Sequence, residues 1–136
     1  MNRRRFLTTA AACAIAPFSA QAAVNYTPGL VKDRLAKGEV VFLDFAADWC
    51  STCAAQERVI NDLRAGNPAY DQKITFVRVD WDAYRKSALT TELKVPRRST
   101  LIVLQGDKEL GRIVAGTRSA DIKKLMDSAL AAASAS

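Results

Sequence analysis

Apolar residues along this chain alternate between strand-like and helix-like spacing. Residues 40–46 form an almost unbroken apolar run, Val-Val-Phe-Leu-Asp-Phe-Ala, which predicts a strand buried on both faces. The β-branched run 74–80 and the apolar run 100–104 predict two further strands. Residues 110–115 predict a fourth strand, which the tight turn Gly106-Asp107 joins to the third as a hairpin.

Segments with helical spacing separate these strands. We expect helices over residues 29–37, 50–64 and 84–93, and from Ser119 to about residue 131. Residues 24–28 are expected to be a short lead-in. Strands joined through helices run parallel, whereas the final hairpin is antiparallel. The order therefore predicts an α/β domain with a mixed sheet of about four strands and helices on both faces.

The first 22 residues have the pattern of an export signal. Arg3-Arg4-Arg5 precedes a mildly apolar run, which leads to the cleavage-type sequence Ala20-Gln21-Ala22. The run is too short to span a bilayer, which takes about 20 apolar residues. With Phe6-Leu7, the arginines resemble the twin-arginine signal that carries folded proteins across bacterial membranes. We expect cleavage after Ala22 and a periplasmic mature chain. The alternatives are an ordinary export signal and an amphipathic helix of the domain itself.

Composition and charge narrow the class of protein. The chain has 136 residues, enough for one domain, which we place at residues 23–131, followed by a disordered Ala/Ser-rich tail at 132–136. It carries 20 basic and 14 acidic residues, a formal net charge of +6. Three of the basic residues lie in the export signal, so the remainder has a net charge of +3, which predicts no nucleic-acid partner. The chain has no histidine, which excludes Ser-His and Cys-His catalytic pairs.

Two of the three cysteines form the motif Trp49-Cys50-Ser51-Thr52-Cys53 directly after the first predicted strand. We interpret Cys13 as an apolar filler of the export signal that is lost on cleavage. Cys50 would begin a helix, where unpaired amides and the helix dipole stabilise a thiolate. Cys53, one turn further along, would be more buried and have a higher pKa. Cys50 would then attack a substrate disulfide, and Cys53 would resolve the mixed disulfide.

Two alternative interpretations of this cysteine pair, a zinc site and a structural disulfide, have less support. A structural zinc ion needs four ligands, and the mature chain has no other cysteine or histidine to supply them. A purely structural disulfide would close a very short loop and stabilise the fold little. We therefore expect a redox pair with no bound cofactor or metal.

The segment from Val41 to Cys53, with the sequence Ala47-Asp48-Trp49-Cys50, resembles the active-site strand and elbow of the thioredoxin family. It is particularly similar to the C-terminal domain of bacterial membrane thiol:disulfide interchange reductases. The similarity continues through residues 77–80 and 100–104 to Ala115-Gly116-Thr117. It implies a thioredoxin-like fold and thiol–disulfide oxidoreductase activity.

The resemblance also implies roles for single residues. Asp44 matches the buried acid that exchanges protons with the resolving cysteine, and burial on an apolar strand should raise its pKa toward neutrality. Trp49 would shield the thiols and offer an apolar surface to substrates. Arg98, Ser99 and Thr100 match the loop that contacts bound substrate.

The chain departs from the family where a cis-proline faces the thiols. A gap-free alignment places Ser99 at that position, whereas a second alignment places Pro96 there and inserts three residues. The spacing to Gly116 favours Ser99. A cis bond before a residue other than proline costs about 2.5–4 kcal/mol, so the bond before Ser99 is expected to be trans.

Charged residues near the motif have two interpretations each. Arg97 and Arg98 would stabilise the Cys50 thiolate and favour acidic partners, or form a solvated basic loop. Arg78, which matches a family lysine, would modulate Asp44 or only decorate the sheet. We leave these alternatives open.

The sequence thus predicts an exported, monomeric oxidoreductase that exchanges disulfides with exported proteins. The absence of histidine between the cysteines argues against a strong oxidant, so we expect a reductant or isomerase that a membrane-bound thiol donor re-reduces. One rival is a protein that binds copper or another soft metal through Cys50 and Cys53. Another is a non-catalytic binding module that uses the fold as a scaffold.

Overall fold

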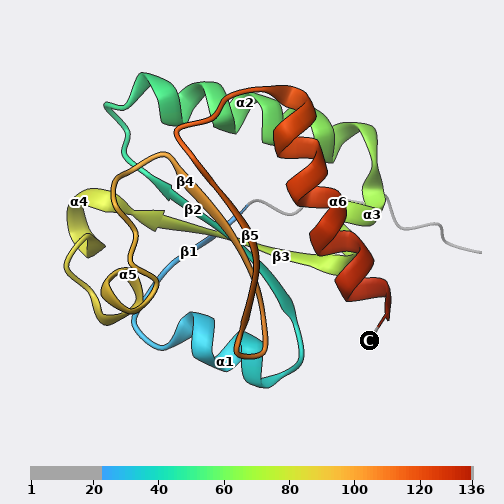
Figure 1. The fold of residues 1–136 in the computed structure, drawn as a ribbon, viewed down its shortest axis with the longest axis horizontal. Coiled ribbons are helices and arrows are strands. Elements are labelled where there is room, and N and C mark those ends of the chain that lie inside the picture. Colours follow the sequence, from blue (N-terminus) through green and yellow to red (C-terminus); the bar gives the residue numbers. More distant parts are fainter. Residues whose placement is uncertain (1–22, 136) are drawn as a thin grey trace, which may run out of the picture.

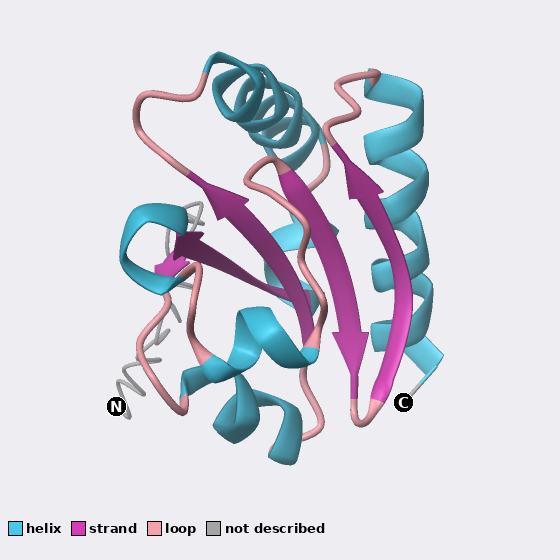
Figure 2. Ribbon diagram, turned by 60° about the vertical axis from the view of Figure 1, so that its left-hand side comes forward, coloured by secondary structure: helices cyan, strands magenta, loops and turns pink. Residues whose placement is uncertain are grey.

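The computed structural model describes residues 23–135, so the predictions for the export signal, Cys13 and cleavage after Ala22 lie outside the described residues. One sheet lies between two layers of helices (Figures 1 and 2). Its strands, in the spatial order β1-β3-β2-β4-β5, are β1 (Val24–Asn25), β2 (Val40–Ala46), β3 (Ile74–Asp80), β4 (Thr100–Gln105) and β5 (Lys108–Val114). Strands β1, β3 and β2 are parallel, β4 is antiparallel to β2, and β5 is antiparallel to β4. The predicted mixed α/β sheet is confirmed.

Six helices complete the described part of the chain. They are α1 (Leu30–Ala36), α2 (Ser51–Gly66), α3 (Pro68–Lys73), α4 (Trp81–Tyr84), α5 (Ala88–Glu92) and α6 (Ser119–Ala135). Within residues 23–135, no helix has the length and apolar character needed to cross a membrane.

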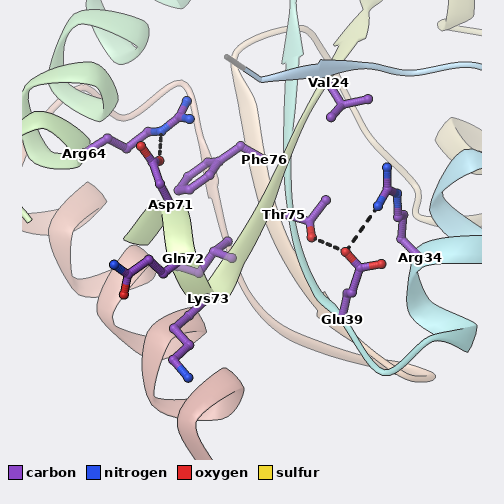
Figure 3. A pocket seen from close by; sticks show the side chains of 10 residues that line it. Val24, Arg34, Glu39, Arg64, Asp71, Gln72, Lys73, Thr75 and Phe76 are labelled. Carbon is purple, nitrogen blue, oxygen red and sulfur yellow. Dashed lines mark hydrogen bonds and ion pairs between the residues drawn. The ribbon is translucent and has the colours of Figure 1, made fainter. Parts of the chain in front are cut away.

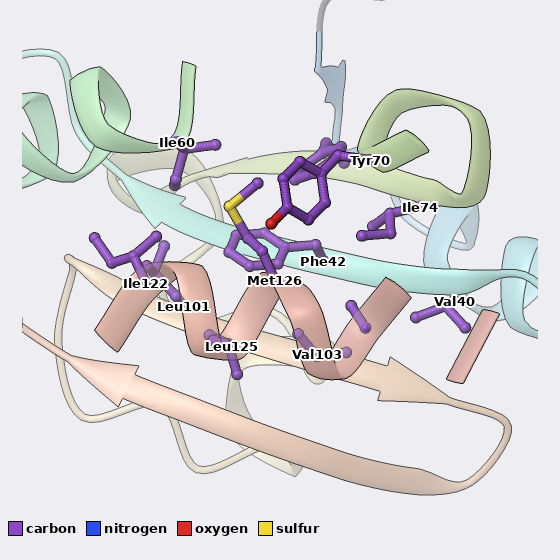
Figure 4. Packing of buried hydrophobic residues seen from close by; sticks show 12 residues of the cluster. Val40, Phe42, Ile60, Tyr70, Ile74, Leu101, Val103, Ile122, Leu125 and Met126 are labelled. Atoms are coloured by element: carbon purple, nitrogen blue, oxygen red, sulfur yellow. The ribbon is translucent and has the colours of Figure 1, made fainter. Parts of the chain in front are cut away.

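Each face of the sheet has its own apolar core, because successive side chains of β2 point to opposite faces. Phe42 points to the layer of α2, α3 and α6, where α6 contributes Ile122 and Met126 (Figure 4). Leu43 points to the opposite layer of α1, α4 and α5. Asp44 shares the face of Phe42, so the one acidic residue of the strand lies on the side covered by α2.

The topology brings two distant segments to one edge of the sheet. Phe45, near the end of β2, pairs with Thr100, the first residue of antiparallel β4. The chain therefore leaves β2 to begin α2 at the same place where it enters β4. Cys50 and Ser99, which are 49 positions apart in the sequence, meet there.

The single helix predicted over residues 84–93 is wrong. Two short helices replace it: α4 begins before the predicted segment and ends at its first residue, and α5 lies within it. The Asp80 carboxylate accepts a hydrogen bond from the Asp82 N–H and so begins α4 earlier than expected. The Ser87 hydroxyl accepts one from the Thr90 N–H, which starts a separate helix within the predicted one.

Two elements were not predicted. Asn67 caps α3 by accepting a hydrogen bond from the Ala69 N–H at 3.1 Å, and Pro68 occupies the first turn. The predicted break is therefore a junction between two helices. Val24 and Asn25, predicted to be part of a lead-in, pair with β3 as a fifth strand at the edge of the sheet.

The last helix extends beyond its predicted end. Residues 132–135, expected to be disordered, continue α6. The Gln105 side-chain amide donates to the Ala132 carbonyl at 3.3 Å, and Ala132 and Ala133 pack against the core. These contacts hold a segment whose composition alone predicted fraying.

Candidate active site

The two cysteines of the motif are reduced and lie at the start of α2. Cys50 is the N-cap of the helix, and its sulfur accepts a hydrogen bond from the Cys53 N–H at 3.2 Å. Only 4% of Cys50 and 2% of Cys53 are exposed. The helix start therefore directs an unpaired amide at the Cys50 sulfur, where it favours negative charge.

Ser99 bridges the two sulfur atoms. Its Oγ lies 3.2 Å from the Cys50 Sγ and 3.0 Å from the Cys53 Sγ, and the residue is fully buried. Pro96, the other candidate for this position, is exposed in the preceding loop. The geometry thus supports the alignment that places Ser99 opposite the thiols. The bond before Ser99 is trans as expected, since residues 23–135 contain no cis peptide.

The backbone of Ser99 is held in an unfavourable conformation. Its φ of 63° lies in the left-handed region, which costs a residue other than glycine about 1–3 kcal/mol. The Ser99 N–H donates to the Phe45 carbonyl at 2.7 Å, and the Ser99 carbonyl accepts from the Ala115 N–H at 2.8 Å. These bonds to β2 and to the end of β5 fix the serine against the thiols.

The surroundings separate the pKa values of the two thiols. Burial opposes ionisation of Cys50, but hydrogen bonds from the Cys53 thiol, Ser99 and the Cys53 N–H, together with the Arg98 side chain, lower its pKa to about 7. Burial raises the pKa of Cys53, and the neighbouring Cys50 raises it further. The predicted assignment of Cys50 as the thiolate and Cys53 as the thiol agrees with these directions.

The serine hydroxyl has one proton, so it can donate to only one sulfur at a time. When Cys50 is a thiolate, it can accept hydrogen bonds from both the Ser99 O–H and the Cys53 S–H. The Ser99 Oγ then also lies 3.0 Å from the Cys53 sulfur, so the hydroxyl contacts both members of the pair.

Asp44 lies on β2 beneath the same helix. Burial is the main reason that its pKa rises to about 7, the negative charges of Glu57 and Cys50 raise it further, and Arg78 opposes the shift. Its Oδ1 is buried and finds no hydrogen-bond donor within residues 23–135. The carboxyl can therefore take up or release a proton near neutral pH, as the sequence predicted.

Trp49 and Arg98 form the rim of the site. Trp49 is 60% exposed and donates from Nε1 to the Asp82 Oδ2 at 2.9 Å, which fixes the ring. The Arg98 guanidinium lies over this ring, 4.5 Å from its centroid. Its Nε is buried with no acceptor in the described part of the chain. The exposed indole lies next to Cys50 in the sequence.

Thr100 and Arg78 lie beside the site and contact other residues of the protein. Thr100 is fully buried, and its hydroxyl donates to the Arg97 carbonyl at 2.7 Å, which supports the loop. Its contact with substrate stays a prediction. Arg78 lies opposite Asp44 on β3 and forms an ion pair with Asp48 at 2.9 Å. It acts on Asp44 through its charge, which is one of the two interpretations left open above.

Gln56 was missed by the sequence reasoning. It is fully buried, and its Nε2 donates to the carbonyl oxygens of Ser99 at 3.0 Å and Gly116 at 2.9 Å. A polar residue three positions after Cys53, on the buried face of the helix, was the available signal.

A polar pocket lies at the other end of the sheet, where β2 and β3 begin (Figure 3). Arg64 and Asp71 form an ion pair there, and Glu39 accepts hydrogen bonds from Thr75 at 2.7 Å and Arg34 at 3.5 Å. These four charged groups are therefore engaged in contacts within the protein. Nowhere in residues 23–135, this pocket included, could a group of three or more Cys, Asp or Glu side chains hold a metal ion, so the copper hypothesis rests on the two thiols alone.

Several known proteins are similar to this chain. Residues 16–128 match the family model for thioredoxins. A mitochondrial thioredoxin-2 of Schizosaccharomyces pombe is 30% identical over 92 residues, which cover 68% of this chain and 62% of that protein. The crystal structure of Trxlp from Edwardsiella tarda is 31% identical, with a TM-score of 0.64 over 76% of this chain and 98% of that one. Thioredoxin from Trypanosoma brucei brucei has the same fold, with 19% identity and a TM-score of 0.65 over 82% of this chain and 94% of that one.

Proposed function

This chain belongs to the thioredoxin family and is a thiol–disulfide oxidoreductase, and from that premise we propose that it reduces or isomerises disulfides in exported proteins, with Cys50 as the attacking thiolate. The observation that carries the proposal is the difference between the pKa values of the two thiols. Cys50 has a pKa lowered to about 7 at the start of a helix, whereas burial raises the pKa of Cys53. Only one of the two sulfurs is prepared to attack.

The exchange takes two steps. The Cys50 thiolate attacks one sulfur of a substrate disulfide, that bond breaks, and the other substrate sulfur leaves as a thiolate. Cys53 then loses its proton and attacks the Cys50 sulfur of the mixed disulfide. The bond between Cys50 and the substrate sulfur breaks, that sulfur leaves with the electron pair as a thiolate, and the chain retains a Cys50–Cys53 disulfide. The substrate has gained the two electrons that the chain has lost.

Asp44 would accept the proton that Cys53 releases in the second step. A carboxyl with a pKa near 7 is well matched to this work at neutral pH. Ser99, which contacts both sulfurs, would stabilise the negative charge on whichever sulfur carries it. These groups let a buried thiol become a nucleophile without a histidine.

Trp49 and Arg98 would make up the substrate-binding surface around the thiols, and buried Thr100 would support it from beneath through its hydrogen bond to the Arg97 carbonyl. The exposed indole offers an apolar surface, and the guanidinium stacked on it would attract an acidic side chain beside the substrate disulfide. This basic rim supports a narrow range of partners. A relationship to the periplasmic domains of membrane thiol:disulfide interchange reductases would rest on the sequence Ala47-Asp48-Trp49-Cys50.

The proposed place of action, the periplasm, rests on the sequence of the first 22 residues. A twin-arginine-like signal would carry the chain to the periplasm, with cleavage after Ala22. A reductant there loses two electrons in each turnover, so a membrane-bound thiol donor would have to return them. Replacing Arg3 and Arg4 by lysine tests the route. Retention of the uncleaved chain in the cytoplasm supports it, and unchanged export shows an ordinary signal.

The direction of electron flow is tested by equilibrating the chain with glutathione buffers and counting free thiols by alkylation and mass. A potential near that of thioredoxin, about −270 mV, supports a reductant. A potential near −120 mV, roughly that of a strong periplasmic oxidant, would reverse the direction. The Cys50→Ser variant is the control and should form no intramolecular disulfide between residues 50 and 53.

A further inference from the structure

Gln56 is a buried polar residue that joins three parts of the active site. It lies on α2, one turn beyond Cys53, and is 0% exposed. Its Nε2 donates to the Ser99 carbonyl at 3.0 Å and to the Gly116 carbonyl at 2.9 Å. A primary amide has two N–H donors, so both are used. The helix that carries the thiols is thereby tied to the residue before β4 and to the loop between β5 and α6.

Packing alone does not account for a glutamine at this position. The Gln56 Oε1 is buried and receives no hydrogen bond from the described residues. An unpaired buried acceptor reduces stability. An apolar side chain of similar length would fill the same volume without that cost, and the other buried residues of α2, Cys53 and Ile60, are apolar. What an apolar residue cannot reproduce is the pair of bonds to the two carbonyls.

Ser99 is the residue that these bonds hold. Its backbone is left-handed, its N–H donates to the Phe45 carbonyl, and its own carbonyl accepts from both the Ala115 N–H and Gln56. With both backbone polar groups engaged, the direction of the Cα–Cβ bond is fixed. The hydroxyl then lies within 3.2 Å of both sulfur atoms.

We propose that Gln56 is a positioning residue for thiol–disulfide exchange: it holds Ser99 in the orientation in which its hydroxyl bridges the sulfur atoms of Cys50 and Cys53. Gln56 acts through Ser99, because its amide bonds carbonyl groups of the two loops. The role rests on the exchange function proposed above. In effect, a hydrogen-bonded serine and its glutamine occupy the place that a rigid proline ring has in the family.

The test compares Gln56→Met, Ser99→Ala and the double variant in the full chain. Ionisation of Cys50 is followed against pH by thiolate absorbance and by alkylation mapped to Cys50 by mass, and denaturant unfolding reports on the fold. We expect Gln56→Met to fold. At pH values below the pKa of Cys50, it should lower the fraction of Cys50 present as thiolate about three- to tenfold. Ser99→Ala should lower it at least as much, and the double variant should equal Ser99→Ala. Val59→Met, at a half-buried position on the same helix, is the matched control and should leave the pKa unchanged.

An unchanged Cys50 pKa in Gln56→Met, or effects that add in the double variant, would overturn the proposal. If Gln56→Met fails to fold, Gln56→Leu is measured against the same criteria. The readout needs no protein substrate, so the two proposals can fail separately. A chain that shifts as expected but reduces no disulfide loses only the exchange function. A chain that reduces disulfides without the shift loses only the positioning role.

Discussion

The Arg98 guanidinium lies over the Trp49 indole, 4.5 Å from the ring centroid. The stacking holds a positive charge at the rim of the active site, next to an exposed apolar surface. This charge also favours the Cys50 thiolate. One side chain therefore acts both on the nucleophile and on the surface that a substrate meets.

Arg98→Ala should lower the rate of reduction of a peptide disulfide flanked by glutamates about three- to tenfold more than that of a neutral peptide. The reason is the loss of an attractive charge at the rim. Rates are measured with matched synthetic disulfides at low and high salt. Lys86→Ala removes an equal charge from an exposed position in the loop between α4 and α5 and should treat both peptides alike. Equal losses with both peptides in Arg98→Ala would contradict charge selection.

Asp44 should make the folded chain less stable as pH rises. Its pKa is about 7 in the fold, against an ordinary value of 3.8. Between these values the folded chain keeps a proton that the unfolded chain releases, so the free energy of unfolding falls from about pH 4 to about pH 7 and is then level. Asp44→Asn should remove this slope and be more stable above pH 7, by up to about 4 kcal/mol.

Urea unfolding at a series of pH values checks this expectation. Asp62→Asn, at an exposed position of α2, is the control and should keep the slope of the parent chain. Parallel stability curves for Asp44→Asn and the parent chain would show that the carboxyl is not held protonated by the fold.

Introducing the family proline should harm this chain. Ser99→Pro removes the N–H that donates to the Phe45 carbonyl and cannot adopt a φ of 63°. We expect a loss of about 3 kcal/mol or more in the free energy of unfolding. Ser99→Gly retains the N–H and permits the left-handed backbone, so it should stay folded while the pKa of Cys50 rises. A Ser99→Pro variant as stable as its parent would mean that the loop readily adopts the family conformation.

Tyr70 should stabilise the contact between α3 and α6. Its hydroxyl donates to the Asp127 Oδ1, and the same carboxylate forms an ion pair with Lys123. Tyr70→Phe leaves the ring in the core but removes the hydrogen bond, at a cost of about 1–2 kcal/mol. Thermal or denaturant unfolding measures this cost. In an Asp127→Asn background the same substitution should cost clearly less, and an equal cost would assign the effect to ring packing.

The parts of the fold that the sequence predicts are those with a strong local pattern. The apolar run of β2, the hairpin of β4 and β5 and the helix after the cysteines were all recognisable, because burial on both faces and a tight turn leave clear signals. Strand β1 was missed because two residues carry no periodicity and owe their conformation to pairing with β3. The split between α4 and α5 depends on capping by Ser87, a residue that is also compatible with a helix interior.

The candidate site likewise has residues that the sequence predicts and features that it does not. The sequence and the family resemblance pointed to Cys50, Cys53, Asp44 and the position of Ser99. The left-handed backbone of Ser99 and its link to Gln56 come from contacts across more than 40 positions, which no local pattern reports. They became visible only when β2, β4 and α2 were brought to one edge of the sheet.

The small exposed fraction of Cys50 has a consequence for its chemistry with small molecules. A thiolate near neutral pH is intrinsically reactive, yet only 4% of this residue meets solvent, beside a tryptophan that is 60% exposed. We therefore expect a small oxidant that reaches the sulfur by diffusion to react slowly, and a protein partner that contacts the indole to present its disulfide more readily. Burial of the thiolate would thus reduce unproductive oxidation of the pair between encounters with a partner.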